Sequence, residues 1–140
     1  MLALTLFGPP TLRRDGAEIA LPIRKSMALL VLLARQATPM PRGRVAAMLW
    51  PGLGEPVARR NLRRELARLR EAGAGDALQV DGDRLALDGV ACDLGGFEAA
   101  CAAGQVEEAL ALWRGLPADG FALGDADAFD DWLAAEREQL

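Results

Sequence analysis

Residues 57–72 read VARRNLRRELARLREA, and this stretch decides how the rest of the chain is interpreted. Its apolar positions recur at the spacing of an α-helix and fall on one narrow stripe, which consists of Ala58, Leu62, Leu66 and Leu69. Gly73-Ala74-Gly75 follows directly and is typical of a helix C-terminus. The pattern predicts a helix that packs one face on a core and exposes the other.

Arginine dominates the other faces of this predicted helix. Six arginines lie off the apolar stripe, at about 60–240° from Leu62 on a helical wheel: Arg59, Arg60, Arg63, Arg64, Arg68 and Arg70. They repel one another in water, with local relief only from Glu65 and Glu71, while the small Ala67 lets this face approach a groove wall. A polyanion relieves the repulsion and gains from counterion release, so we expect the helix to bind nucleic acid.

The expected contacts follow from the chemistry of the guanidinium group, which binds phosphate bidentately and reads guanine through O6 and N7. Four arginines in the N-terminal half are expected to reach base edges or flanking phosphates: Arg59, Arg60, Arg63 and Arg64. We expect Arg70 on the DNA backbone, whereas Asn61 and Arg68 border the faces and serve packing or phosphate contact. An ordinary solvated helix gives the same pattern, so the neighbouring elements must decide.

Those neighbours predict a helix-turn-helix with a wing. A buried helix is expected over 24–36 and a shorter one over 42–50, and a hairpin over 78–87 follows the arginine-rich helix. In this arrangement the recognition helix, 57–72, enters the major groove and flanking elements touch the backbone. Three further arginines are candidates for such flanking contacts, although a plain surface role fits them equally well: Arg42 and Arg44 at the start of the second helix and Arg84 in the hairpin.

The two ends of the chain differ in character. Three short strands over 2–7, 11–14 and 17–21 predict a small antiparallel sheet. Three amphipathic helices are expected after the hairpin, marked by Phe97 with Cys101, by Val106, Leu110 and Trp113, and by Phe129, Trp132 and Leu133. We therefore predict an α+β fold with two parts: a winged-helix DNA-binding domain over 1–92 and the incomplete start of an α-helical domain over 93–140.

Charge divides the chain in a similar way. Residues 1–70 hold 13 basic and 4 acidic residues, a net +9, whereas residues 71–140 hold 3 basic and 16 acidic residues, a net −13. The acidic half would repel DNA, so it is expected to lie away from the duplex or to face another protein. An ordinary solvated surface explains it as well and is the simpler interpretation.

Other classes of function find little support. The chain has no histidine, and its two cysteines, Cys92 and Cys101, form no metal-binding pattern, so we expect them to be buried apolar groups. We expect no catalytic residue, metal or cofactor. Trp50 is expected in the core, and the 5% aromatic content disfavours single-stranded nucleic acid. The longest apolar run, 27–34, is too short to span a membrane, and a cytoplasmic location is the default expectation.

Taken in order, these pieces resemble the SARP-type (antibiotic regulatory protein) bacterial transcriptional activators over essentially the whole chain. The resemblance lies first in the segments 4–9, 24–34, 42–51 and 58–70. Residues 93–97, 109–115 and 131–137 are similar to the start of the family's bacterial transcriptional activation domain. Two departures are Arg84-Leu85, where the wing usually has a glycine and an aromatic residue, and Pro41, where a capping serine or threonine is common.

The resemblance implies an OmpR-type winged helix followed by stacked, TPR-like helical pairs. It also implies an activator that binds direct repeats in double-stranded DNA as side-by-side protomers, a homodimer on DNA, and that recruits RNA polymerase. The alternative from a different class is a winged-helix protein-interaction module that does not bind DNA. The net +9 of residues 1–70 argues against that alternative.

Overall fold

The computed structural model describes residues 1–139, which form two compact units. The first combines residues 1–19 with 89–121, and the second combines 20–88 with the segment from 122 onward. The predicted boundary after residue 92 falls inside the first unit, because β7 (Val90–Cys92) pairs with β1 (Leu2–Thr5) and α4 (Asp93–Ala102) follows it directly. Each unit therefore joins segments that are distant in the sequence.

A small sheet forms the base of the first unit, with strand order β3-β2-β1-β7. The predicted antiparallel part is confirmed: β2 (Thr11–Arg14) pairs with β1 and with β3 (Ala17–Ile19). Asp15 and Gly16 have φ of 50° and 87°, the left-handed backbone that a tight hairpin turn requires. The parallel strand β7 was not predicted from the sequence.

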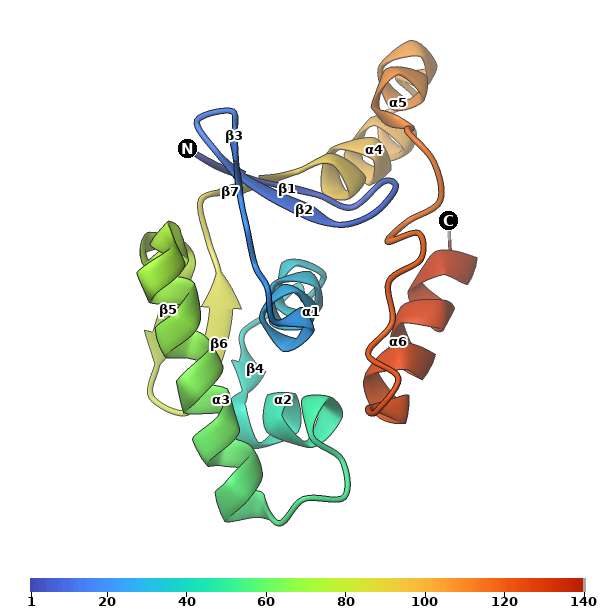
Figure 1. The fold of residues 1–140 in the computed structure, drawn as a ribbon. Coiled ribbons are helices and arrows are strands. Elements are labelled where there is room, and N and C mark those ends of the chain that lie inside the picture. The colour runs from blue at the N-terminus through green and yellow to red at the C-terminus, as the bar shows by residue number, and fades with distance from the viewer. Residues whose placement is uncertain (140) are drawn as a thin grey trace. The chain divides into compact units, whose positions relative to one another are not determined.

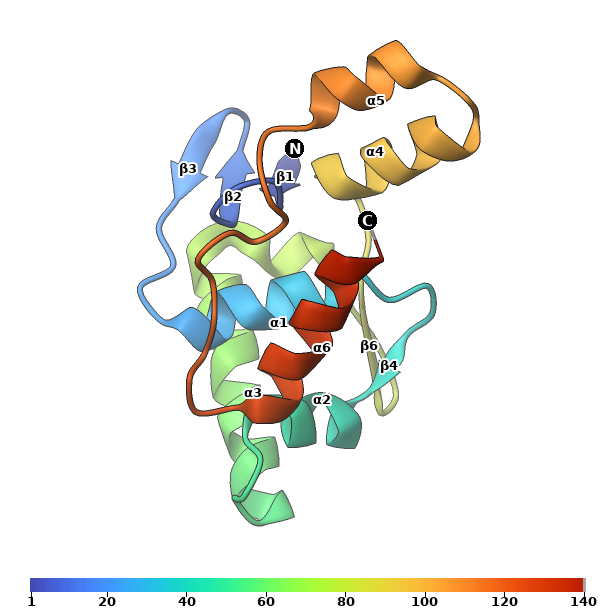
Figure 2. The same ribbon diagram turned by 90° about the vertical axis from the view of Figure 1, so that its right-hand side faces the viewer.

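Helices α4 and α5 (Val106–Leu112) lie side by side in the same unit (Figure 2). Phe7, Phe97 and Trp113 form a ring cluster with centroids 5.0–5.5 Å apart. The helix expected around Val106, Leu110 and Trp113 is present, but these three residues are 66%, 67% and 41% exposed and do not form a buried face. The buried residue of this short helix is Ala109, and its Leu112 side chain lies against Gly96 of α4.

The second unit contains the predicted winged helix-turn-helix (Figure 1). Its helices are α1 (Arg24–Ala34), α2 (Arg42–Leu49) and α3 (Glu55–Leu69), and its sheet has the order β4 (Met40–Pro41), β6 (Arg84–Leu87), β5 (Leu78–Asp81). Every residue of α1 from Ser26 to Leu33 is buried, as expected for a central helix that is apolar nearly all round. The hairpin β5–β6 is the wing.

The start and end of α3 differ slightly from the prediction. It begins two residues earlier than expected, at Glu55, with Pro56 in the first turn where its missing N–H costs nothing. Beyond Leu69 the chain continues in two irregular helical turns, Arg70–Ala74 and Gly75–Ala77. Gly73 changes the chain direction there with a φ of 98°, a conformation open to glycine.

Helix α6 (Asp127–Glu138) also belongs to the second unit and lies on the other side of α1 from α3 (Figure 1). Phe129 and Leu133 are 0% and 4% exposed. Lys25 pairs with Asp125 at 2.9 Å, and Arg35 at the end of α1 pairs with Glu136 at 3.2 Å. The sequence assigned α6 to the helical domain, but apolar burial and ion pairs place it on the winged helix.

Two further predictions about single side chains are corrected. Cys101 is exposed and Cys92 only half-buried, since both belong to the small first unit. Trp50 is half-buried rather than in the core, and its ring lies 5.5 Å from the Lys25 ammonium group. None of the helices described over residues 1–139 is long and apolar enough to cross a membrane.

Candidate nucleic-acid interface

The inner face of α3 is the predicted apolar stripe. Ala58, Leu62, Leu66 and Leu69 are between 0% and 3% exposed. In both ribbon views the N-terminal end of α3 extends past α2 (Figures 1 and 2). Because this stripe is buried, only the other sides of α3 are available to a binding partner.

Glu65 lies on the buried side of α3, not on the exposed basic face. It is 3% exposed, and its carboxylate accepts a hydrogen bond from Ser26 Oγ of α1 at 2.7 Å and forms an ion pair with Arg68. A buried carboxylate needs such partners to offset its desolvation. The helical wheel carried this signal, since Glu65 falls about 60° from Leu62, at the edge of the stripe.

Four of the six arginines lie on the outer face of α3 or, in the case of Arg70, directly after its last residue. Arg60, Arg63, Arg64 and Arg70 are exposed, and so is Ala67 among them. Within residues 1–139 these four guanidinium groups have no ion pair or hydrogen bond to another side chain. They are cations on one helix face whose charge the protein leaves uncompensated.

Arg59 and Arg68, by contrast, are engaged within the protein. The Nε of Arg59 donates to Glu55 at 3.0 Å and its Nη1 donates to Asp83 of the wing turn at 3.2 Å. These two carboxylates raise the pKa of the Arg59 guanidinium, Asp83 more than Glu55. Arg68 forms an ion pair with Glu65. The structure thus separates Arg59 from Arg60, Arg63 and Arg64, with which the sequence-based prediction grouped it.

The remaining candidate arginines flank α3. Arg42 and Arg44 begin α2, Arg42 half-buried and Arg44 exposed. Arg84 is exposed at the start of β6 and lies 3.4 Å from the carbonyl oxygen of Pro39. The exposed carboxylates of Asp81 and Asp83 lie beside it at the wing turn.

Charge is strongly divided within the second unit. Residues 20–88 carry 12 basic and 7 acidic residues, a net +5, whereas residues 122–139 carry one basic and six acidic residues, a net −5. The acidic segment contains α6, which lies across α1 from α3 (Figure 1). Because opposite charges occupy opposite sides of α1, a polyanion is attracted to the α3 side.

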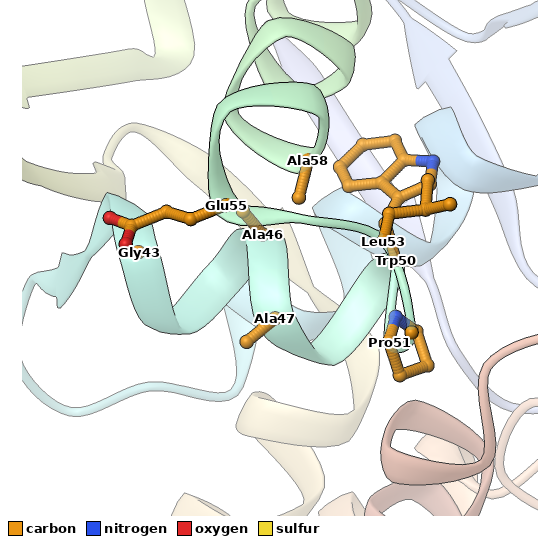
Figure 3. Close-up of a pocket in the computed structure, with 9 residues that line it drawn as sticks. Gly43, Ala46, Ala47, Trp50, Pro51, Leu53, Glu55 and Ala58 are labelled. Atoms are coloured by element: carbon orange, nitrogen blue, oxygen red, sulfur yellow. The ribbon is translucent and has the colours of Figure 1, made fainter.

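A cavity of about 380 Å³ lies between α2 and the loop that leads into α3 (Figure 3). Small residues such as Ala46, Ala47 and Ala58 line it beside Trp50 and Leu53. Its charged lining residue, Glu55, extends towards the start of α2. With an acidic group and no basic one along its lining, this cavity does not suit a phosphate.

The second unit has three helices and a wing, and the first has a sheet and a helix pair, which together give this chain a SARP-like winged-helix fold. The solved structure of Mycobacterium tuberculosis EmbR, a SARP-family regulator in complex with a low-affinity phosphopeptide, is similar. The TM-score is 0.74 at 25% sequence identity, over 99% of this chain and 42% of the EmbR chain. The chain thus spans less than half the length of EmbR.

Two other comparisons give no relatives. No protein-family model matches the sequence, and no curated protein matches it. The similarity to EmbR supports a SARP-like fold for this chain.

Proposed function

We propose that this protein binds double-stranded DNA as part of a bacterial transcriptional activator, with α3 in the major groove. The observation that carries the proposal is the outer face of α3, where four exposed arginines have no partner among residues 1–139. Burying the charge of a phosphate backbone on this face releases counterions and removes the mutual repulsion of the arginines. The small Ala67 allows close approach, and an α-helix fits the width of the major groove.

The proposed contacts differ between the elements. Arg60, Arg63 and Arg64 are proposed to reach base edges or adjacent phosphates, and Arg70 to lie on the backbone. Arg42 and Arg44 meet a flanking phosphate from the start of α2. Arg84 remains a weaker candidate, because the exposed carboxylate of Asp81 lies opposite it in the hairpin and repels the same phosphates.

The wider assembly is proposed on the resemblance to SARP-type activators. Such a protein binds direct repeats as side-by-side protomers and contacts RNA polymerase. The similarity to EmbR supports this assignment, and no residue of this chain is assigned to the polymerase contact. The location that fits the function is the cytoplasm.

The test compares two charge reversals in a fluorescence-anisotropy titration with a labelled generic duplex. Arg63→Glu should reduce affinity more than tenfold at about 0.1 M salt, because it removes a phosphate partner and adds a repelling charge. Arg114→Glu makes the same change on an exposed residue of the first unit and should alter affinity less than twofold. Equal, weak and salt-independent binding of wild type and Arg63→Glu would instead favour the protein-interaction module.

A further inference from the structure

Arg59 is the one residue of the predicted DNA-binding set that joins three elements of the winged helix. Its guanidinium group meets Glu55 in the first turn of α3 and Asp83 in the turn between β5 and β6. It also lies against Gly43 in the first turn of α2. The group is therefore placed where the recognition helix, the wing and the second helix come together.

We propose that Arg59 is a positioning residue that clamps the wing to the recognition helix and neutralises the wing carboxylate, instead of contacting DNA itself. The inference rests on the proposed function, because it assigns a role within the same interface. It changes the role expected for Arg59 from the sequence and leaves Arg60, Arg63, Arg64 and Arg70 as the contact set.

Gly43 supplies an independent observation for the clamp. A Cβ atom at this position would lie 3.0 Å from Arg59 Nη2, so a larger residue would displace the guanidinium group. Glycine is a poor helix former, yet Gly43 lies in the first turn of α2. The space left by its missing side chain is occupied by Arg59.

The wing turn is held in place at a second point. The backbone N–H of Arg42 donates to the carbonyl oxygen of Asp83 at 2.7 Å. Together with the bond from Arg59 to the Asp83 carboxylate, this fixes both the backbone and the side chain of the turn. The side chain of Arg59 is 35% exposed, in keeping with a group that is occupied within the protein.

The ion pair between Arg59 and Asp83 is expected to affect the affinity for DNA. Asp83 lies next to the arginine face of α3, where an unpaired carboxylate repels phosphates. Arg59 cancels that charge, and it would have to leave two carboxylates before it could hold a phosphate. Arg59 therefore affects DNA binding by neutralising the Asp83 carboxylate and not by contacting the DNA.

A first measurement tests the clamp in the free protein. Hydrogen exchange of the Arg42 amide should accelerate at least fivefold in both Arg59→Gln and Asp83→Asn, because either change releases the wing turn. Arg63→Gln is the matched control and should leave the exchange rate unchanged. Unaltered exchange in Arg59→Gln would overturn the clamp, whether or not the protein binds DNA.

A second measurement uses DNA affinity across a salt series for the two single variants and the double variant. Arg59→Gln should weaken binding about fivefold, and adding Asp83→Asn should restore it to within twofold of wild type, since the cluster of Arg59, Asp83 and Glu55 then regains its wild-type net charge. The double variant should keep the wild-type salt slope. If Arg59 instead holds a phosphate, the double variant stays as weak as Arg59→Gln and its slope falls by about 0.9.

These outcomes separate the two proposals. Accelerated Arg42 exchange without any duplex binding by wild type would sustain the clamp and contradict the proposed function. Duplex binding with a normal effect of Arg63→Gln, but without rescue by Asp83→Asn, would sustain the proposed function and contradict the role of Arg59.

Discussion

Helices α3 and α6 lie on opposite sides of α1 and each buries an apolar face, but their charged side chains differ in their partners. Three of the six carboxylates in residues 122–139 have partners inside the second unit: Asp125 with Lys25, Glu136 with Arg35, and Asp130 with the backbone of Leu123 and Gly124. By contrast, Arg60, Arg63, Arg64 and Arg70 have none within residues 1–139. Apolar burial thus attaches both helices, and the α3 side adds a cluster of exposed, unpaired cations that suits a polyanion.

The largest expected effect tests whether both helices are integral to the unit. Leu62→Ala in α3 and Phe129→Ala in α6 should each lower the free energy of unfolding by about 3–5 kcal/mol, because both side chains are 0% exposed and leave a cavity. Urea denaturation measures the loss. A much smaller loss for Phe129→Ala would show that α6 is only loosely attached to α1 and α2.

A smaller effect is expected at the buried carboxylate under α3. Glu65→Ala removes the acceptor of Ser26 Oγ and the partner of Arg68, and should destabilise the protein by about 1–3 kcal/mol. Glu65→Gln retains an acceptor and should cost less. The same urea titration checks both variants, and equal stability of Glu65→Ala and wild type would contradict the buried network.

A substitution of Ala67 tests whether the outer face of α3 enters a DNA groove. Ala67→Leu should leave stability within about 0.5 kcal/mol, because the position is exposed, but should weaken duplex binding about fivefold by holding the arginines off the groove. Ala134→Leu, on an exposed position of α6, is the matched control and should not alter binding. Undiminished affinity of Ala67→Leu would mean that this face does not enter a groove.

The smallest effect concerns the ion pair that anchors α6. A double-mutant cycle of Arg35→Ala and Glu136→Ala should give a coupling energy of about 0.5–1 kcal/mol, since the two side chains are 12% and 20% exposed and only partly screened by water. Thermal or urea unfolding of the four proteins measures it. A coupling of zero would mean that this ion pair does not contribute to holding α6 on the second unit.

The parts that could be predicted from the sequence are those set by local spacing. The apolar stripe of α3 repeats with the helix period. The turn residues Asp15-Gly16 and Gly82 predict the two hairpins. The ion pairs of Arg59 with Glu55 and of Arg68 with Glu65 could also have been predicted from the sequence, because residues three or four apart share a helix face.

The parts that could not be predicted depend on contacts between distant segments. β7 is three residues long and is defined by its parallel pairing with β1, a strand that lies far away in the sequence, near the N-terminus. Asp83 meets Arg59 across 24 positions, and Asp125 meets Lys25 across 100. The periodicity of a single helix carries no information about either partner, so the clamp and the place of α6 emerge only from the fold.

The central claim is that the four unpaired arginines of α3 neutralise DNA phosphates, and the salt dependence of duplex binding tests it most directly. We predict that log affinity falls steeply with log salt for wild type, and that replacing Arg60, Arg63, Arg64 and Arg70 by glutamine flattens the slope by about 0.9 for each arginine that lies on a phosphate. A slope that is unchanged in the fourfold variant would contradict the claim.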